Sequence, residues 1–325
     1  RKSTSATAFW KLNGKINNMP KKVPKQVKLV KDSYIKQSKS HKHISYSQLF
    51  TYLSCKRKWE LQYLRNVAPY DPSIHAVFGS AFHETLQNYL DVMYNNTAKA
   101  ADEIDTNAYL YERMVKNYKR QKMQNGNEHF SDPDEMNMFW LDGKHIMDFI
   151  KKKRGGYFSK KNTYLAGIET LLYQEISPGI YFKGFIDLVF YNKLLDEYTL
   201  VDIKTSTKGW NKFAKADDKK TFQLLLYKEF FAKQFNVPIE KVNVEYFIVK
   251  RRVPVEADFA SMQRRVQEFK PTDGKIKRGK AISAMNHFIK DVLDNNGEYI
   301  DKTYPCTGDR SPCWHCNVYD GVLQK

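Results

Sequence analysis

Residues 184–204, GFIDLVFYNKLLDEYTLVDIK, decide the fold of this chain. Two runs rich in β-branched and aromatic residues, 181–191 and 198–204, flank a polar segment at 192–197, which is typical of a β-hairpin. A third run of this kind, 165–176, is followed by the turn residues Ser177-Pro178-Gly179. The sequence therefore predicts three consecutive strands arranged as a meander.

Two carboxylates and a lysine meet on this predicted hairpin. Successive side chains of a strand point to opposite faces, so Asp202 and Lys204 share one face and Ile203 points away. Pairing of the two strands would bring Asp187 close to Asp202. Such oxygen ligands suit Mg²⁺ or Mn²⁺, which would lower the pKa of a bound water while Lys204 orients that water. Alone, a short Asp-x-Lys motif is more often a surface ion pair.

Helical patterns surround the predicted strands. Ser45 and Gln48 have the spacing of a helix capping box, which predicts a helix to about residue 65. Periodic apolar residues predict the other elements. These are a helix at 77–94, a charged helical insertion at 100–155 that ends at the breaker pair Gly155-Gly156, a helix at 217–235, a buried strand at 242–249 and a helix at 278–294. The order of elements indicates an α/β protein.

Positive charge is concentrated at the start of the chain. The formal net charge is +18, and residues 1–44 contribute +11 of it, from twelve Lys and Arg against the single acid Asp32. We expect this segment to be a flexible basic arm that either solubilises the protein or attracts phosphate, and we expect the folded domain at 45–325. A mitochondrial or chloroplast transit peptide is also basic and poor in acids, so targeting to an organelle stays open.

The overall composition narrows the classes of partner. Net positive charge favours a polyanion such as DNA over an acidic small molecule. No apolar stretch reaches the roughly 18 residues of a membrane span, and no short apolar run follows the basic start as in a secretory signal. The expected compartment is therefore intracellular, by default the cytoplasm, with no membrane as a partner.

Five groups of residues follow one another along the chain in an order that identifies a family. They are Ser45-Tyr46-Ser47 with Cys55-Lys56-Arg57-Lys58-Trp59, Gly79-Ser80-Ala81-Phe82-His83-Glu84, Gly184-Phe185-Ile186-Asp187, Val201-Asp202-Ile203-Lys204-Thr205, and Gln223-Leu224-Leu225-Leu226-Tyr227. In this order they resemble the RecB-type nucleases of the PD-(D/E)XK superfamily. The resemblance implies a restriction-endonuclease-like core, in which helices flank a mixed sheet, with a helical insertion and a cysteine-rich metal staple at the C-terminal end.

The resemblance also implies the roles of individual residues. Asp187 and Asp202 would be metal ligands together with the carbonyl of Ile203, and Lys204 would be the catalytic lysine. His83 would be a further metal ligand, because neutral imidazole can fill that role. Taken alone, His83 would more often be an ordinary core or surface histidine.

Three further residues are expected near the active site. Gln223 and Tyr227 are four positions apart and so share one helix face, which in the family borders the active site and contacts DNA or the attacking water. Glu169 stands where many relatives have a glutamate before the first catalytic aspartate. Glu175 competes for that place, because it lies on the same predicted strand face.

The four cysteines are expected to hold one structural metal centre: Cys55, Cys306, Cys313 and Cys316, the last three within a cysteine-rich end at 304–318. Grouped thiols of an intracellular protein favour a metal. A subset of RecB-like nucleases, which includes helicase-nuclease subunits and CRISPR-adaptation exonucleases, binds a 4Fe-4S cluster through four cysteines. The spacing departs from theirs, since Cys306 precedes the Cys-x2-Cys pair. Structural Zn²⁺ is the alternative, with His315 able to replace one thiolate.

The expected function is that of a DNA nuclease dependent on Mg²⁺ or Mn²⁺, an exonuclease on single strands or duplex ends. It would act in DNA recombination, repair, replication or phage DNA metabolism, with a helicase or recombination protein as a candidate partner. Two alternatives stay open. One is a catalytically silent DNA-binding module, and the other is a site-specific endonuclease.

Overall fold

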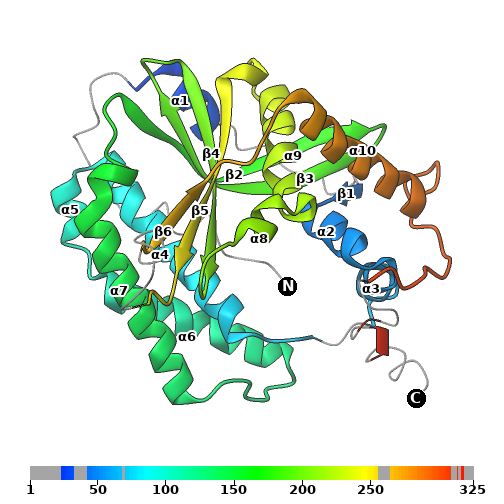
Figure 1. Ribbon diagram of the computed structural model, residues 1–325, viewed down its shortest axis with the longest axis horizontal. Coiled ribbons are helices and arrows are strands. Elements are labelled where there is room, and N and C mark those ends of the chain that lie inside the picture. The colour runs from blue at the N-terminus through cyan, green and yellow to red at the C-terminus, as the bar shows by residue number, and fades with distance from the viewer. Residues whose placement is uncertain are drawn as a thin grey trace.

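The computed structural model describes residues 23–32, 42–67, 70–254, 264–308, 313 and 316–317. Within these residues the chain forms one mixed sheet of six strands (Figure 1). The strands are β1 (Lys42–Ile44), β2 (Thr163–Ser177), β3 (Ile180–Asn192), β4 (Glu197–Ser206), β5 (Val242–Lys250) and β6 (Val266–Phe269). Strands β2, β3 and β4 form the predicted antiparallel meander, and β5 adds to β4 in parallel.

Helices cover both faces of this sheet. They are α1 (Lys25–Lys31), α2 (Tyr46–Ser54), α3 (Lys56–Trp59), α4 (Ile74–Asn95), α5 (Ala98–Asp102), α6 (Thr106–Gln124), α7 (Pro133–Tyr157), α8 (Lys212–Ala216), α9 (Asp218–Gln234) and α10 (Lys275–Val292). A π-helical turn, Glu60–Leu64, follows α3, and a 3-10 turn, Ile239–Lys241, precedes β5. None of the described helices is long and apolar enough to cross a bilayer.

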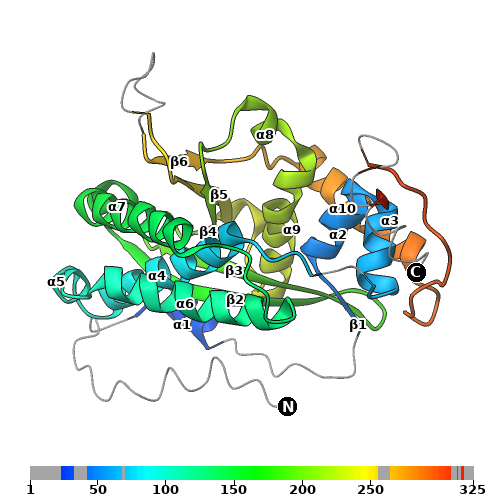
Figure 2. The same cartoon turned by 90° about the horizontal axis from the view of Figure 1, so that it is seen from below.

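Two apolar cores lie on opposite faces of the sheet. Along β4, Leu200 packs into the core shared with α2, α9 and α10, whereas Val201 and Ile203 pack into the core shared with α4, α6 and α7. This alternation follows from the two-residue period of a strand. The predicted α/β architecture, a mixed sheet flanked by helices with a helical insertion, is confirmed (Figures 1 and 2).

The side chains of strand β3 exchange faces of the sheet at Asp187. Ile186 belongs to the core beneath α9, yet Leu188, two positions on, belongs to the core beneath α4. On β2 the facing residue Glu169 has a φ of 46°, which a non-glycine residue rarely adopts. The ladder between β3 and β4 ends here, since its last pair is Leu188 with Val201. The sheet therefore opens between β3 and β4 at this point.

The N-terminal segment departs from the expected flexible arm. Val27 and Val30 of α1 are buried against the sheet, and β1 pairs in parallel with β3. Two valines three positions apart are too few to make a readable helical period, and β1 is held by backbone hydrogen bonds that its sequence does not show. Residues 1–22 and 33–41 lie outside the described part of the chain.

Two other boundaries differ from the prediction. The Gly155-Gly156 pair does not end a helix, because α7 continues through it to Tyr157. The single helix expected from Ser45 to about residue 65 is interrupted at Cys55, whose backbone is extended, with φ −164° and ψ 120°. This break in the helix sets the direction of the Cys55 side chain. With its backbone extended, Cys55 directs its thiol toward the C-terminal cysteines.

Candidate active site and thiol site

The opening between β3 and β4 places two aspartates opposite each other. Beyond the last ladder pair, the N–H of Ile203 donates to Oδ2 of Asp187 at 2.6 Å instead of to a backbone carbonyl of β3. Asp202 precedes Ile203 and is 3% exposed. The carboxylate of Asp187 thus takes the place of a backbone carbonyl as the acceptor for Ile203. This hydrogen bond holds Asp187 beside Asp202.

Lys204 lies on the same strand face as Asp202, as strand alternation requires. Its Nζ is 2.8 Å from Oδ2 of Asp202 and donates to Oε1 of Gln223 at 3.1 Å. Nε2 of Gln223 in turn donates to the hydroxyl of Tyr227 at 3.3 Å. Helix α9 therefore presents Gln223 and Tyr227 to the lysine from one helix face.

The glycine of the Gly184-Phe185-Ile186-Asp187 motif has a packing reason. A Cβ at Gly184 would lie 2.9 Å from the ring of Tyr227, closer than side-chain contacts allow. The backbone of Phe185 hydrogen-bonds the Tyr227 hydroxyl. Gly184 therefore lets the tyrosine lie flat against the open edge of β3, next to Asp187.

Helix α4 contributes His83 from the other side of the sheet. Nδ1 of His83 is 3.6 Å from Oδ2 of Asp187, and the ring also hydrogen-bonds the backbone of Ile203. A Cβ at Gly79, one turn earlier, would lie 3.3 Å from Oγ1 of Thr205, so the glycine permits close approach of α4 to β4. Burial, reinforced by the charge of Lys204, lowers the pKa of His83 to about 3. The imidazole is therefore neutral, the form that binds metals.

Glu169 joins this group through a residue that sequence reasoning missed. Nε2 of Gln87 donates to Oε1 of Glu169 at 2.7 Å and to the carbonyl of Asp187 at 3.3 Å. Gln87 is one helical turn after His83, so this spacing could have identified it. The competing Glu175 lies at the β2–β3 turn, where its Oε1 accepts from the N–H of Gly179 at 2.9 Å.

The electrostatics of this group suit a divalent cation. Burial, together with the negative charge of Asp202, raises the pKa of Asp187 well above its ordinary value. Burial also raises the pKa of Asp202, against the opposing effect of Lys204. Oδ2 of Asp202 is buried and, despite the nearby lysine, makes no hydrogen bond of acceptable geometry to the described residues. Crowded carboxylates and a neutral imidazole form a donor set that fits Mg²⁺ or Mn²⁺. We call Asp187, Asp202, Lys204 and His83 the carboxylate site.

The four cysteines come together in a separate group, one at the start of α3 and three from the C-terminal segment. Their sulfur atoms all lie within 4.8 Å of one another, and we call them the thiol site: Cys55, Cys306, Cys313 and Cys316. Cys55 Sγ is 3.8 Å from Cys306 Sγ, 3.7 Å from Cys316 Sγ and 3.9 Å from Cys313 Sγ, and the four are free thiols. The C-terminal segment thus lies beside α3 (Figures 1 and 2). His315 lies outside the described residues.

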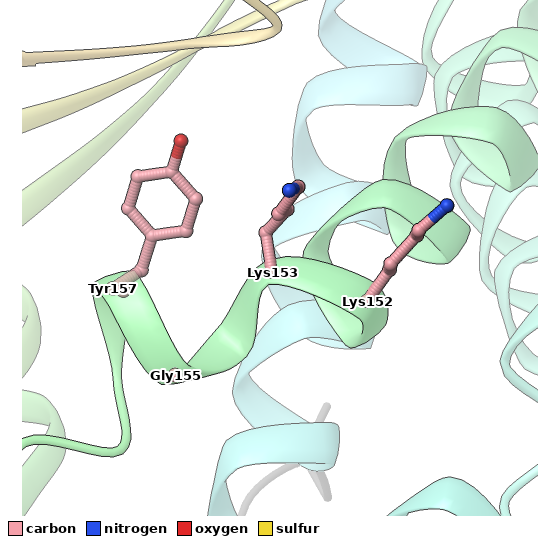
Figure 3. Close-up of a pocket in the computed structure, with 5 residues that line it drawn as sticks. Lys152, Lys153, Gly155 and Tyr157 are labelled. Carbon is pink, nitrogen blue, oxygen red and sulfur yellow. The ribbon is translucent and has the colours of Figure 1, made fainter.

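A shallow recess at the end of α7 is separate from both sites. It is lined by Lys152, Lys153, Gly155, Gly156 and Tyr157. Figure 3 shows the two lysines and the tyrosine rising from the same stretch of helix. The lining contains neither a carboxylate nor a thiol, so the recess offers no metal ligands of the kinds found in the two sites.

Comparisons with known proteins identify the family of this chain. No curated protein matches the chain. Among solved structures, the crystal structure of a "Putative exonuclease" from Eubacterium rectale matches with a TM-score of 0.49 and 13% identity, over 88% of this chain and 91% of the other. The family model described as PD-(D/E)XK nuclease superfamily matches residues 43–320, which is most of the sequence. The chain therefore belongs to the PD-(D/E)XK nuclease superfamily.

Proposed function

We propose that this nuclease is a metal-dependent deoxyribonuclease of the exonuclease type, with its catalytic centre at the carboxylate site. One observation carries the proposal. Asp202 is buried and the Asp187 side chain is 14% exposed beside it, where β3 and β4 separate, and Lys204 Nζ lies 2.8 Å from Asp202. Placing two like charges together is unfavourable unless positive charge or a proton compensates them. The Lys204 ammonium offsets one of the two carboxylates, so a metal cation would account for the other.

The residues of the site divide the chemistry among them. Asp187, Asp202, His83 and the carbonyl of Ile203 would hold Mg²⁺ or Mn²⁺, which supplies Lewis acidity and a bound water of lowered pKa. Burial would lower the pKa of Lys204, but the carboxylates of Asp202 and Asp187 raise it, so the amine stays protonated. Its ammonium can donate to the negative charge that develops on the phosphate.

Neighbouring side chains orient Lys204 and Glu169. The hydrogen bond to Gln223 fixes the direction of the Lys204 ammonium, and Tyr227 fixes Gln223. Gln87 holds Glu169 beside Asp187, which adds a third carboxylate to the same side of the opening. We assign Gln223, Tyr227 and Glu169 to the active site on these contacts.

We also propose that the thiol site binds one structural metal ion, and the sulfur spacing supports zinc. A Zn–S distance of about 2.3 Å in a tetrahedron corresponds to about 3.8 Å between sulfur atoms. The distances from Cys55 are 3.7–3.9 Å, and Cys313 is 3.5 Å from Cys316. In a 4Fe-4S cluster each thiolate binds a different iron, which holds the sulfur atoms farther apart. The spacing thus fits the zinc alternative, and the iron–sulfur cluster that the resemblance implied remains the second candidate, because four thiols without a metal can pack at the same spacing.

The biological setting rests on the family resemblance and on charge. An exonuclease of this kind would act on single strands or duplex ends in DNA recombination, repair, replication or phage DNA metabolism. A helicase or a recombination protein would supply such ends. The net charge of +18 supports a polyanionic substrate.

A panel of DNA forms tests the function directly. The purified protein is incubated with Mg²⁺ or Mn²⁺ and with end-labelled single-stranded DNA, linear duplex and covalently closed circles, with chelator as the control. We expect linear forms to be degraded from their ends and closed circles to stay intact. Circles cut at fixed positions would identify a site-specific endonuclease. Binding without any cleavage would identify a silent DNA-binding module.

A further inference from the structure

Strands β2 and β3 continue beyond the active site as an extension of the sheet, and β1 pairs with the first residues of β3 there. In this part Leu171 pairs with Phe185, Tyr173 with Lys183 and Glu175 with Tyr181. Cross-strand partners project from the same face of a sheet, so these odd-numbered residues form one surface. Three aromatic side chains dominate it, and we call Tyr173, Tyr181 and Phe185 the aromatic strip.

The two faces of this extension are packed differently. The even-numbered face carries Leu172, Phe182 and Ile186, which are fully buried in the core beneath α9. On the odd-numbered face Phe185 is 44% exposed, and Tyr173 and Tyr181 are half-buried. Figure 2 shows α4, α6 and α7 grouped at one end of these strands, which continue past them toward β1. Among the described helices, none buries the strip.

Two of the three rings of the strip stack on each other. The rings of Tyr173 and Tyr181 are 4.8 Å apart between centroids and inclined by 14°, so they are stacked. Lys183 lies between Tyr181 and Phe185 on the same strand face and adds positive charge. His43 of β1 is in register with Tyr181 and is exposed, which widens the surface by one strand. Isolated exposed aromatics are ordinary, but a contiguous group marks a binding surface.

The strip begins at the carboxylate site. Phe185 precedes Asp187 by two residues on β3, and Leu171 follows Glu169 by two residues on β2. Two residues of a strand span about 6.7 Å, so this end of the strip is close to the catalytic aspartate, although β3 changes faces at that residue. A single strand lying on the strip would therefore have its end near the active site.

We propose that the aromatic strip binds single-stranded DNA and leads its end to the carboxylate site. The proposal rests on the proposed function and names its substrate class. Unpaired bases expose π faces that stack on aromatic side chains whatever the sequence, whereas a duplex keeps these faces inside its own stack. Lys183 and His43 provide phosphate contacts beside the rings. The strip accordingly selects a single strand over a duplex.

Binding assays with matched DNA test this proposal. Each variant is made in Asp202→Asn protein, so that DNA is not cleaved, and the anisotropy of a labelled 20-nucleotide oligo-dT is compared with that of a 20-base-pair blunt duplex. We expect Phe185→Ala and Tyr173→Ala each to weaken oligo-dT binding about tenfold, since stacking contributes about 1–3 kcal/mol per base. Duplex affinity should stay the same. Tyr111→Ala on α6, which removes an aromatic side chain that is 58% exposed, should change neither.

Two conservative variants separate stacking from packing. Phe185→Leu keeps an apolar side chain of similar size but removes the ring, and it should weaken oligo-dT binding as Phe185→Ala does. Phe185→Trp keeps an aromatic ring and should bind oligo-dT as tightly as the Asp202→Asn protein that has Phe185. The proposal would be overturned if no strip variant changed the affinity for oligo-dT. It would also be overturned if the affinities for duplex and for oligo-dT fell equally. If the wild-type protein cleaves no DNA form, the proposed function fails instead, which the cleavage panel reports independently.

Discussion

The carboxylate site and the thiol site differ in the electrostatics of their ionisable groups. At the carboxylate site, burial and mutual repulsion raise the pKa of Asp187 and Asp202, so the site without a cation is electrostatically unfavourable. At the thiol site, the N–H of Cys313 donates to Cys306 Sγ and lowers the pKa of that thiol to about 6, whereas burial raises the pKa of Cys313 and Cys316. In the proposed function, the first site carries out the reaction and the second holds the two ends of the fold together. Substitutions at the two sites should therefore change different measured properties of the protein.

The two sites also differ in how the chain reaches them. Asp187 and Asp202 face each other across one hairpin, whereas Cys55 and Cys306 are separated by 251 positions. Bringing distant segments together has a larger loop-closure cost, which a metal bond offsets. The comparison predicts that changes at the carboxylate site abolish activity in a folded protein, and that changes at the thiol site reduce stability first.

The largest effect is expected from Asp202→Asn. It should lower Mg²⁺-dependent cleavage at least about 10³-fold, equivalent to about 4 kcal/mol in the transition state, because a metal ligand and the partner of Lys204 are lost. Thermal unfolding followed by circular dichroism should change little, since one of two repelling carboxylates is removed. Asp196→Asn, in the β3–β4 turn, is the matched control and should cleave normally. Near wild-type cleavage by the Asp202 variant would contradict the mechanism.

A smaller effect, on stability, is expected from Cys55→Ser. It should abolish metal binding and lower the free energy of unfolding by about 3–5 kcal/mol, the range known for cross-links that close long loops. Cleavage by the folded fraction at low temperature should stay within about threefold of wild type. Metal analysis of the wild-type protein should find one zinc per chain. Brown protein with several irons and acid-labile sulfide would instead support the iron–sulfur cluster, and a metal-free protein indifferent to the substitution would contradict both.

The smallest effect is expected at Asp291, which joins α10 to the region of the thiol site without a metal. Its carboxylate contacts Lys56 at 2.9 Å and Lys302 at 2.7 Å, and it accepts from the hydroxyl of Tyr52. Burial alone would raise the pKa of Asp291, but hydrogen bonds from Lys302, Tyr52 and Lys56 hold it well below its ordinary range. We expect Asp291→Asn to lower the free energy of unfolding by about 1 kcal/mol at pH 7, because partly exposed ion pairs contribute little.

The pH dependence of this effect has a definite sign. A carboxyl group whose folded pKa lies below its unfolded value near 3.9 stabilises the fold at higher pH, and this contribution is lost as pH falls through the folded pKa. Denaturant titrations at pH 7 and pH 3 should show the difference between wild type and Asp291→Asn narrowing at the lower pH. A difference that widens toward acid would contradict the assignment.

The sequence predicted the meander and the meeting of Asp202 with Lys204, because both follow from the two-residue period of a strand. It did not predict the break at Cys55 or the strand β6, since these depend on partners far away in the chain. Gln87 was missed although it lies one helical turn after His83, because that spacing shows a shared helix face but not the acceptors that it meets on β2 and β3. The opening between β3 and β4 is likewise a property of paired strands that neither strand shows alone.

The hydrogen bond from Ile203 to Asp187 gives this acid two independent reasons to persist. One is chemistry, and the other is that Ile203 would lose a buried hydrogen-bond acceptor if the side chain were shortened. A descendant that gave up cleavage and kept only DNA binding would still be under selection to retain an acceptor at position 187. An intact Asp187 in a relative is therefore weak evidence of activity, and Asp202 with Lys204 is the more informative pair. For the same reason Asn, which keeps the acceptor, separates catalysis from folding at this position better than Ala does.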